Sequence, residues 1–411
     1  MPLNSIPPTT TVENLAAKRS AAREQCWTDV AFWGGVIPGN QVRSFLFLSY
    51  LVEKSTKNRV FPLGSIGSFG RCWCQRIQMF YDRKWCRGYN RIVGVCLQFY
   101  TEDQTRNSHV SPKLICDLPC PYSRYDGCRL SIHSSAMRTL ANTTQDKDTT
   151  LLFHAEMDDH HEGQPMPTMT SEDPTVYSTF LSSRPESFEV DAISRIIDLQ
   201  KEFRSLRCHI VHLSAAQALP IIRRAKAAGH RLTVETCFHY LCLESDSIPD
   251  GRPEFKCCPP IRDAVNREAL WAALLDGTIN CVVSDHSPCV GELKKLDQGD
   301  IMRAWGGIST LGFGLSLLWT EGRKRNVPIG TILRWVSEST AIHAGLGDTK
   351  GKIAVGYDAD LVIWDPDAQY TVRTASSFRG DWLNVRPDHE GNGSVQEQDH
   401  SIRRPGALWS G

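Results

Sequence analysis

The chain has 411 residues, of which 41% are hydrophobic and 22% are charged, a composition typical of a globular protein. Its 46 basic residues balance its 46 acidic residues, so charge gives no reason to expect a nucleic-acid or anionic-lipid partner. No apolar run reaches the ~18 residues that a membrane helix needs, and the opening MPLNSIPPTT lacks the basic and apolar regions of a signal peptide. We therefore expect a cytoplasmic protein with no membrane and no nucleic-acid partner, whose 15 cysteines are thiols.

The segment 41–135 differs from the rest of the chain, because it has no sustained helical or strand period and is crowded with cysteines. These are Cys72, Cys74, Cys86, Cys96, Cys116, Cys120 and Cys128. A zinc module needs two Cys-x2-4-Cys units; Cys116 and Cys120 provide one, whereas Cys72 and Cys74 are too close together. We interpret the segment as aberrant and expect it to contribute no regular strand.

From residue 136 onward, apolar strands alternate with amphipathic helices. The pattern predicts strands at 149–156, 208–214, 231–237 and 279–287, and helices at 187–203, 215–229, 264–277, 311–319 and 329–346. Strands that are nearly all apolar and alternate with helices are typical of a parallel sheet covered by helices. Because no strand is followed by a glycine-rich dinucleotide motif, a (β/α)8 TIM-barrel-like fold is favoured over a doubly wound sheet.

Polar side chains gather where these strands end, which in such barrels is the active-site rim. His154 ends the first of the four strands, His212 the second, and Asp285 the fourth, while Glu235 and His239 lie at the end of the third. Imidazole and carboxylate groups are the usual ligands of catalytic zinc. A single histidine at a strand end is more often structural, but the whole set favours a metal site.

The order of several motifs resembles the cyclic amidohydrolases, and most closely the allantoinases. The motifs are IVHLS, VETCFHYL, KCCPPIR, VVSDHSPC and AWGGIS. The resemblance implies an early barrel fragment in 1–40, the C-terminal part of the β/α barrel in 136–350, and a remnant of a small β-domain with an irregular tail in 351–411. The barrel is expected to be incomplete, because residues 1–40 resemble the family after its second barrel strand.

The resemblance also implies a chemistry. Allantoinases hydrolyse the hydantoin ring of allantoin to allantoate with two divalent ions, such as zinc, cobalt or manganese, bridged by a carboxylated lysine. Matching motifs assign His154 and His212 to one metal, and Asp285 to the other metal and to catalysis as a proton acceptor. They assign substrate contacts to Ser287 and Trp305. The expected partner is therefore a small molecule, with a homo-oligomer possible.

Two family features are missing from the sequence. No His-x-His pair and no Gly-Phe-Lys-Cys-Phe motif is present, so the second metal site and the bridging lysine are expected to be absent. Read one base later, however, the codons of Met79 and Phe80 must give cysteine, and those of Trp85 and Cys86 must give glycine. The codon before that cysteine must encode lysine or arginine, and the neighbouring codons permit the missing motif. We hypothesise that 41–135 is an out-of-frame or mis-spliced translation of allantoinase coding sequence.

Three interpretations therefore remain open. The first is an allantoinase-like hydrolase whose activity is impaired or lost. The second is a catalytically inactive amidohydrolase remnant. The third is a dihydropyrimidinase-like or dihydroorotase-like hydrolase, although the wording of SDHSPC and WGGIS favours the first over this one.

Overall fold

The computed structural model of the protein describes residues 7–22, 30–36, 94–98, 138, 141–142, 150–157, 173–370 and 402–403. Six parallel strands form one sheet, in the order β1-β2-β3-β4-β5-β6. Their bounds are β1 Gly34–Val36, β2 Gly94–Gln98, β3 Thr150–His154, β4 Arg207–Ile210, β5 Leu232–Cys237 and β6 Cys281–Val283. The spatial order equals the sequence order, as in a β/α barrel, whereas a doubly wound sheet reverses at a switch point. The predicted barrel-like class is confirmed.

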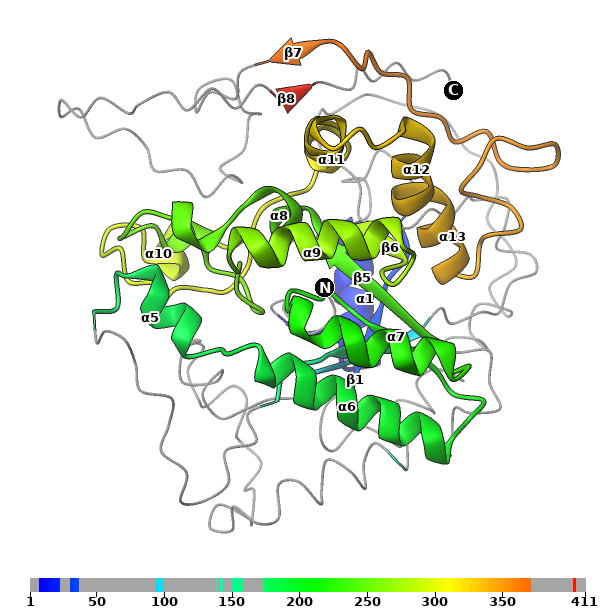
Figure 1. Cartoon of the computed structure of the whole chain (residues 1–411), viewed down its shortest axis with the longest axis horizontal. Coiled ribbons are helices and arrows are strands. Elements are labelled where there is room, and N and C mark those ends of the chain that lie inside the picture. The colour runs from blue at the N-terminus through cyan, green and yellow to red at the C-terminus, as the bar shows by residue number, and fades with distance from the viewer. Residues whose placement is uncertain are drawn as a thin grey trace.

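Helices cover the outer face of this sheet. In Figure 1, α6 (Ser187–Glu202), α7 (Leu219–Ala227) and α9 (Ala264–Leu275) lie in front of the strands. Helix α9 illustrates how the sequence begins and ends a helix at a defined residue. The Asp263 carboxylate accepts the Asn266 N–H at 2.8 Å as the N-cap, and Gly277 follows the helix with φ at +79°. All three helices lie at the predicted positions.

The core fills the space between the helices and the sheet. Leu151 and Phe153 of β3 pack with Ile210 of β4 in one large buried cluster, which includes the inner faces of the helices. Leu152, between them on β3, points to the other side and packs with Val211 against Trp33. This alternation is the period of two expected of a strand and leaves the strand ends free to carry the site.

The expectation that 41–135 contributes no strand is wrong. Strand β2 lies within that segment and pairs in parallel with β1 and β3, with Gly94 opposite Thr150 and Gln98 opposite His154. It coincides with the apolar run RIVGVCLQFY, residues 91–100. Without it, the facing edges of β1 and β3 would expose unpaired backbone groups. The other residues of 41–135 lie outside the described part of the chain. The zinc-module and reading-frame interpretations concern those residues.

The remaining elements extend the chain around the sheet. These are α1 Val12–Ala22, α5 Tyr177–Ser182, α8 Phe238–Cys242, α10 Gly291–Lys294, α11 Gly314–Lys324, α12 Ile329–Leu333, α13 Ser339–His343, and the antiparallel pair β7 Gln369–Tyr370 and β8 Ile402–Arg403. The helix predicted at 329–346 is interrupted by a π-turn at Arg334–Glu338. Among the described residues, no helix combines the length and apolar character needed to cross a bilayer.

Candidate metal centre

Two of the predicted site residues share an unusual backbone conformation. His212 lies two residues after β4 with φ at +41°, and Asp285 lies two residues after β6 with φ at +43°. This left-handed region is costly for most residues with a side chain, though His and Asp enter it more readily than most. Such strain is concentrated at functional sites, and here it turns a side chain at two strand ends of the same sheet. His154 needs no such turn, because it is itself the last residue of β3.

His154 and His212 lie together as predicted. The two rings meet edge to face, with His154 Nδ1 at 3.0 Å from His212 Nε2. The Nε2 atom of His154 is 2.9 Å from the Glu156 carboxylate, which also accepts a bond of 2.6 Å from Arg184. Burial alone would raise the pKa of Glu156, but Arg184 and His154 outweigh burial and lower it. Glu156 is therefore an anion that fixes the His154 ring, whereas His212 Nδ1 has no hydrogen-bond partner among the described residues.

Asp285 occupies a less polar position. Its Oδ1 atom is buried and has no hydrogen-bond partner within the described part of the chain. Burial raises the pKa of Asp285 to about 7, with a further increase from the nearby Glu235, while His154 lowers it. A carboxyl group that titrates near neutrality both accepts and returns a proton readily, which is the property required of a general base.

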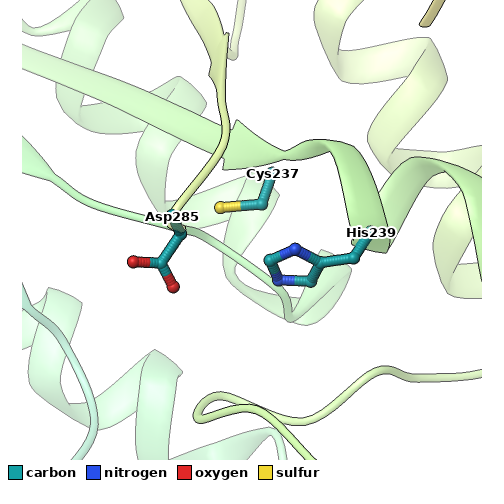
Figure 2. Close-up of side chains that lie close together, drawn as sticks. All are labelled: Cys237, His239 and Asp285. Carbon is teal, nitrogen blue, oxygen red and sulfur yellow. The ribbon is translucent and has the colours of Figure 1, made fainter. Parts of the chain in front are cut away.

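The structure groups Asp285 with His239, which belongs to the strand-end set described above, and with Cys237, which was not predicted as a ligand. Among the described residues, one group of three or more His, Cys, Asp and Glu side chains brings its ligand atoms within 4.8 Å of one another, and it consists of Cys237, His239 and Asp285. Figure 2 shows Cys237 and His239, at the junction of β5 and α8, facing Asp285. The predicted set of His154, His212 and Asp285 therefore falls into a histidine pair and a separate group around Asp285.

The two predicted substrate contacts lie on adjacent loops. The Ser287 N–H donates to the Ile308 carbonyl at 3.1 Å, and its side chain is buried. A Cβ atom on Gly307 would lie 2.4–2.7 Å from atoms of Ser287, so the loops can approach this closely only with glycine there. Trp305 precedes this contact, and its buried Nε1 has no partner among the described residues. It is a hydrogen-bond donor left available next to the loop of Ser287.

A buried lysine that sequence reasoning missed ties these loops together. Lys294, at the end of α10, is fully buried, and its Nζ donates to the carbonyl oxygens of Lys256, Trp305 and Gly307 at 3.0, 2.8 and 2.6 Å. Three donors on one ammonium group match three carbonyl acceptors. Burial lowers the pKa of Lys294 to about 8, which keeps the group protonated at neutral pH. The loop that carries Trp305 is thus held by a buried ammonium group in addition to the packing of Ile301 and Ala304.

The fold, with imidazole, carboxylate and thiol groups gathered at the strand ends, is that of a β/α-barrel-type hydrolase whose rim carries a candidate metal site. The model of the amidohydrolase family matches residues 129–389. The chain belongs to that family.

Its relatives include proteins named as allantoinases. The allantoinase of Saccharomyces cerevisiae is 39% identical over 380 residues, which cover 92% of this chain and 68% of the yeast protein. The mitochondrial allantoinase of Aquarana catesbeiana is 42% identical over 350 residues, which cover 85% of this chain and 58% of the frog protein. The chain thus spans about three fifths to two thirds of the length of these relatives, and it is related to the allantoinases as the sequence motifs implied.

Solved structures agree on the fold. L-hydantoinase from Arthrobacter aurescens aligns with a TM-score of 0.65 at 21% identity, over 91% of this chain and 69% of that protein. D-hydantoinase from a Thermus species aligns with a TM-score of 0.53 at 28% identity, over 59% of this chain and 53% of that protein.

Proposed function

We propose that this site serves the hydrolytic opening of the hydantoin ring of allantoin to allantoate. The observation that carries the proposal is the buried Asp285 carboxyl group, which has an oxygen without a hydrogen-bond partner among the described residues and lies at the strand ends near His154. The identity of 39–42% to proteins named as allantoinases supports this substrate.

The histidine pair fits a divalent ion. Its two facing nitrogens are 3.0 Å apart, and two ligand nitrogens in a tetrahedral zinc site with Zn–N distances of 2.0–2.1 Å are about 3.3 Å apart. A small rotation of the rings therefore suffices for His154 and His212 to hold zinc, cobalt or manganese. When bound, the ion supplies a more acidic water and a polarised amide carbonyl. Glu156 holds the His154 ring in orientation by accepting its Nε2 hydrogen.

Asp285 moves the proton. With a pKa near 7, its carboxylate accepts a proton from the attacking water and returns it to the ring nitrogen that leaves. Asparagine cannot replace Asp285 in this role, because an amide at the same position cannot accept the proton.

Ser287 and Trp305 hold the ring. Trp305 Nε1, which has no partner among the described residues, offers a donor to a ring carbonyl, and Ser287 places backbone and hydroxyl groups on the adjacent loop. Because Lys294 bonds to the carbonyl of Trp305, the position of this loop does not depend on the substrate.

The test is an allantoin ring-opening assay of the full chain with zinc, cobalt or manganese added. Asp285→Asn is expected to abolish turnover and leave the circular dichroism spectrum unchanged. The matched control is Asp263→Asn, because Asp263 caps α9 and asparagine caps a helix equally well. Turnover that survives Asp285→Asn would remove the basis of the proposal.

The same assay separates the alternatives. Hydrolysis of dihydrouracil or dihydroorotate in preference to allantoin supports a dihydropyrimidinase-like or dihydroorotase-like enzyme. No turnover by the printed chain, followed by turnover after the reading frame across 41–135 is restored, supports an allantoinase impaired by the missing lysine motif. No turnover by either protein supports an inactive remnant.

The proposal extends to a cytoplasmic location and a homo-oligomeric assembly. Because the frog relative is named as mitochondrial, cell fractionation must compare both compartments. Gel filtration with light scattering measures the assembly.

A further inference from the structure

We propose that Cys237, His239 and Asp285 form a second, distinct metal site, selective for zinc or cobalt. It lies beside the histidine pair of the proposed hydrolase site, shares only Asp285 with the assigned residues, and takes its thiol and imidazole ligands from the junction of β5 and α8 (Figure 2).

The geometry is close to that of a bound ion. One ligand atom from each of the three side chains lies within 4.8 Å of the others. Ligand atoms around a tetrahedral zinc ion are about 3.3–3.8 Å apart, given Zn–N and Zn–S distances of 2.0–2.3 Å. Contraction by roughly 1 Å, through rotation of the Cys237 and Asp285 side chains, completes the arrangement. Cys237 is fully buried and His239 is 2% exposed, so the ion is shielded from water on the protein side.

The His239 imidazole gives a second, independent indication of a cation site. Both of its nitrogens are buried, and neither has a hydrogen-bond partner among the described residues. Leaving one buried polar atom unsatisfied costs about 1–3 kcal/mol, so a structural histidine normally bonds to a carbonyl. The ring is nevertheless held in place by Tyr240, edge to face at 4.2 Å, and Tyr240 is itself anchored through its hydroxyl to the Pro259 carbonyl at 2.7 Å. A fixed ring whose nitrogens, like Asp285 Oδ1, find no partner in the described part of the chain is arranged for a cation.

The donor set selects the ion. Thiolate and imidazole ligands favour zinc and cobalt, whereas magnesium, calcium and manganese prefer sites built of oxygen atoms. The thiolate and the carboxylate together carry two negative charges, which neutralise a divalent ion in a buried position. Three protein ligands leave a fourth position open to water or to a substrate atom.

Cobalt titration of the metal-free full chain tests the site directly. A thiolate bound to Co²⁺ gives a charge-transfer absorption in the near ultraviolet, which histidine and carboxylate ligands do not give. We expect this band to reach the intensity of one cobalt–thiolate bond per chain and to disappear in Cys237→Ser. The matched control is Cys281→Ser, which alters a buried thiol on the neighbouring strand β6 that lies outside the group, and which must retain the band.

X-ray absorption of the zinc-loaded protein gives a second measurement that needs no variant, in case Cys237→Ser does not fold. One zinc–sulfur bond per protein chain is expected. A zinc shell of nitrogen and oxygen alone, or a charge-transfer band that persists in Cys237→Ser, overturns the proposal.

The two proposals share Asp285, but variants of the histidine pair tell their outcomes apart. His154→Ala and His212→Ala are expected to eliminate allantoin hydrolysis and to leave the cobalt–thiolate band intact. Loss of the band in these variants would mean that the ion sits at the histidine pair, and would refute a distinct site without touching the proposed reaction.

Discussion

The buried ion pair behind the site gives a test of how the fold holds His212. Glu189 of α6 is 2% exposed and accepts the backbone N–H groups of Ser214 and Ala215 at 2.9 and 3.1 Å. These two residues directly follow the strained turn at His212. The carboxylate also accepts a bond of 3.0 Å from Arg262, which is buried as well.

The expected loss of stability follows from the groups that substitution of Glu189 leaves without partners. Glu189→Leu removes the carboxylate, leaves the charge of Arg262 buried and unpaired, and deprives two backbone donors of their acceptor. Breaking a buried pair on one side costs about 3–5 kcal/mol, and each orphaned N–H adds about 1–3 kcal/mol where water cannot reach it. We expect the free energy of unfolding to fall by about 5 kcal/mol or more.

The pair itself stabilises the protein much less. Burial raises the pKa of Glu189 despite the neighbouring Arg262, and Arg262 Nε has no partner among the described residues. Removing both charges is therefore less harmful than removing one. The double variant Glu189→Leu with Arg262→Met should recover about 1–2 kcal/mol relative to Glu189→Leu alone.

Urea unfolding followed by tryptophan fluorescence measures these differences. Glu202→Ala is the control, because Glu202 pairs with Arg138 at the surface and its loss should cost at most about 1 kcal/mol. If Glu189→Leu were no more harmful than Glu202→Ala, or if the double variant were less stable than Glu189→Leu, the buried-charge argument would be refuted.

Three further predictions follow from the loops and the metal ligands. Lys294→Met should destabilise the chain by about 2–4 kcal/mol at pH 7, because three carbonyls lose their donor; urea unfolding at several pH values measures this. Because the folded-state pKa of Lys294 is lowered to about 8, the unfolded chain binds more protons above that pH, so the difference from the parent should grow between pH 8 and 10. Gly307→Ala should displace Ser287 and raise the KM for allantoin, whereas Gly330→Ala, where no atom lies within 4 Å of the added Cβ, should leave the KM unchanged; steady-state kinetics decide this. Metal analysis of Cys237→Ser after desalting should find at most one ion per chain, since the sequence has no lysine motif to bridge a second ion to the histidine pair; two tightly bound ions in this variant would contradict this.

The parts of the fold that were predictable are those set by local pattern. Strands β3 to β6 are short, nearly all-apolar runs between helices, so their burial and order could be inferred from the sequence alone. Strand β2 was missed because the unusual composition around it was given more weight than its own apolar run. The π-turn at Arg334–Glu338 has no signal in the apolar spacing, which continues across it.

The site was predictable only where a side chain lies at or close to the end of a predicted strand. His154 and His212 were expected to meet because neighbouring parallel strands end at one edge, and the structure places them together. The grouping of Asp285 with Cys237 was not foreseen, for two reasons. A buried cysteine is usually a core residue, and the left-handed conformation at Asp285 turns its side chain away from the direction that strand alternation predicts.

Strand β2 shows that the fold and the chemistry of this chain have different requirements. The sheet needs only backbone donors and acceptors between β1 and β3, and any extended apolar run satisfies that need. The rim, in contrast, needs one particular residue, the bridging lysine that the family implies. The register places Gln98 level with His154 in the neighbouring strand. The side chains of β2, from the sequence GVCLQ, include no amine, and only an amine forms the carbamate of a carboxylated lysine. The barrel layout therefore continues through β2 while the bridging ligand implied by the family is absent from that strand. This is why metal content and turnover, rather than folding, are the measurements that distinguish the printed chain from one with a restored reading frame.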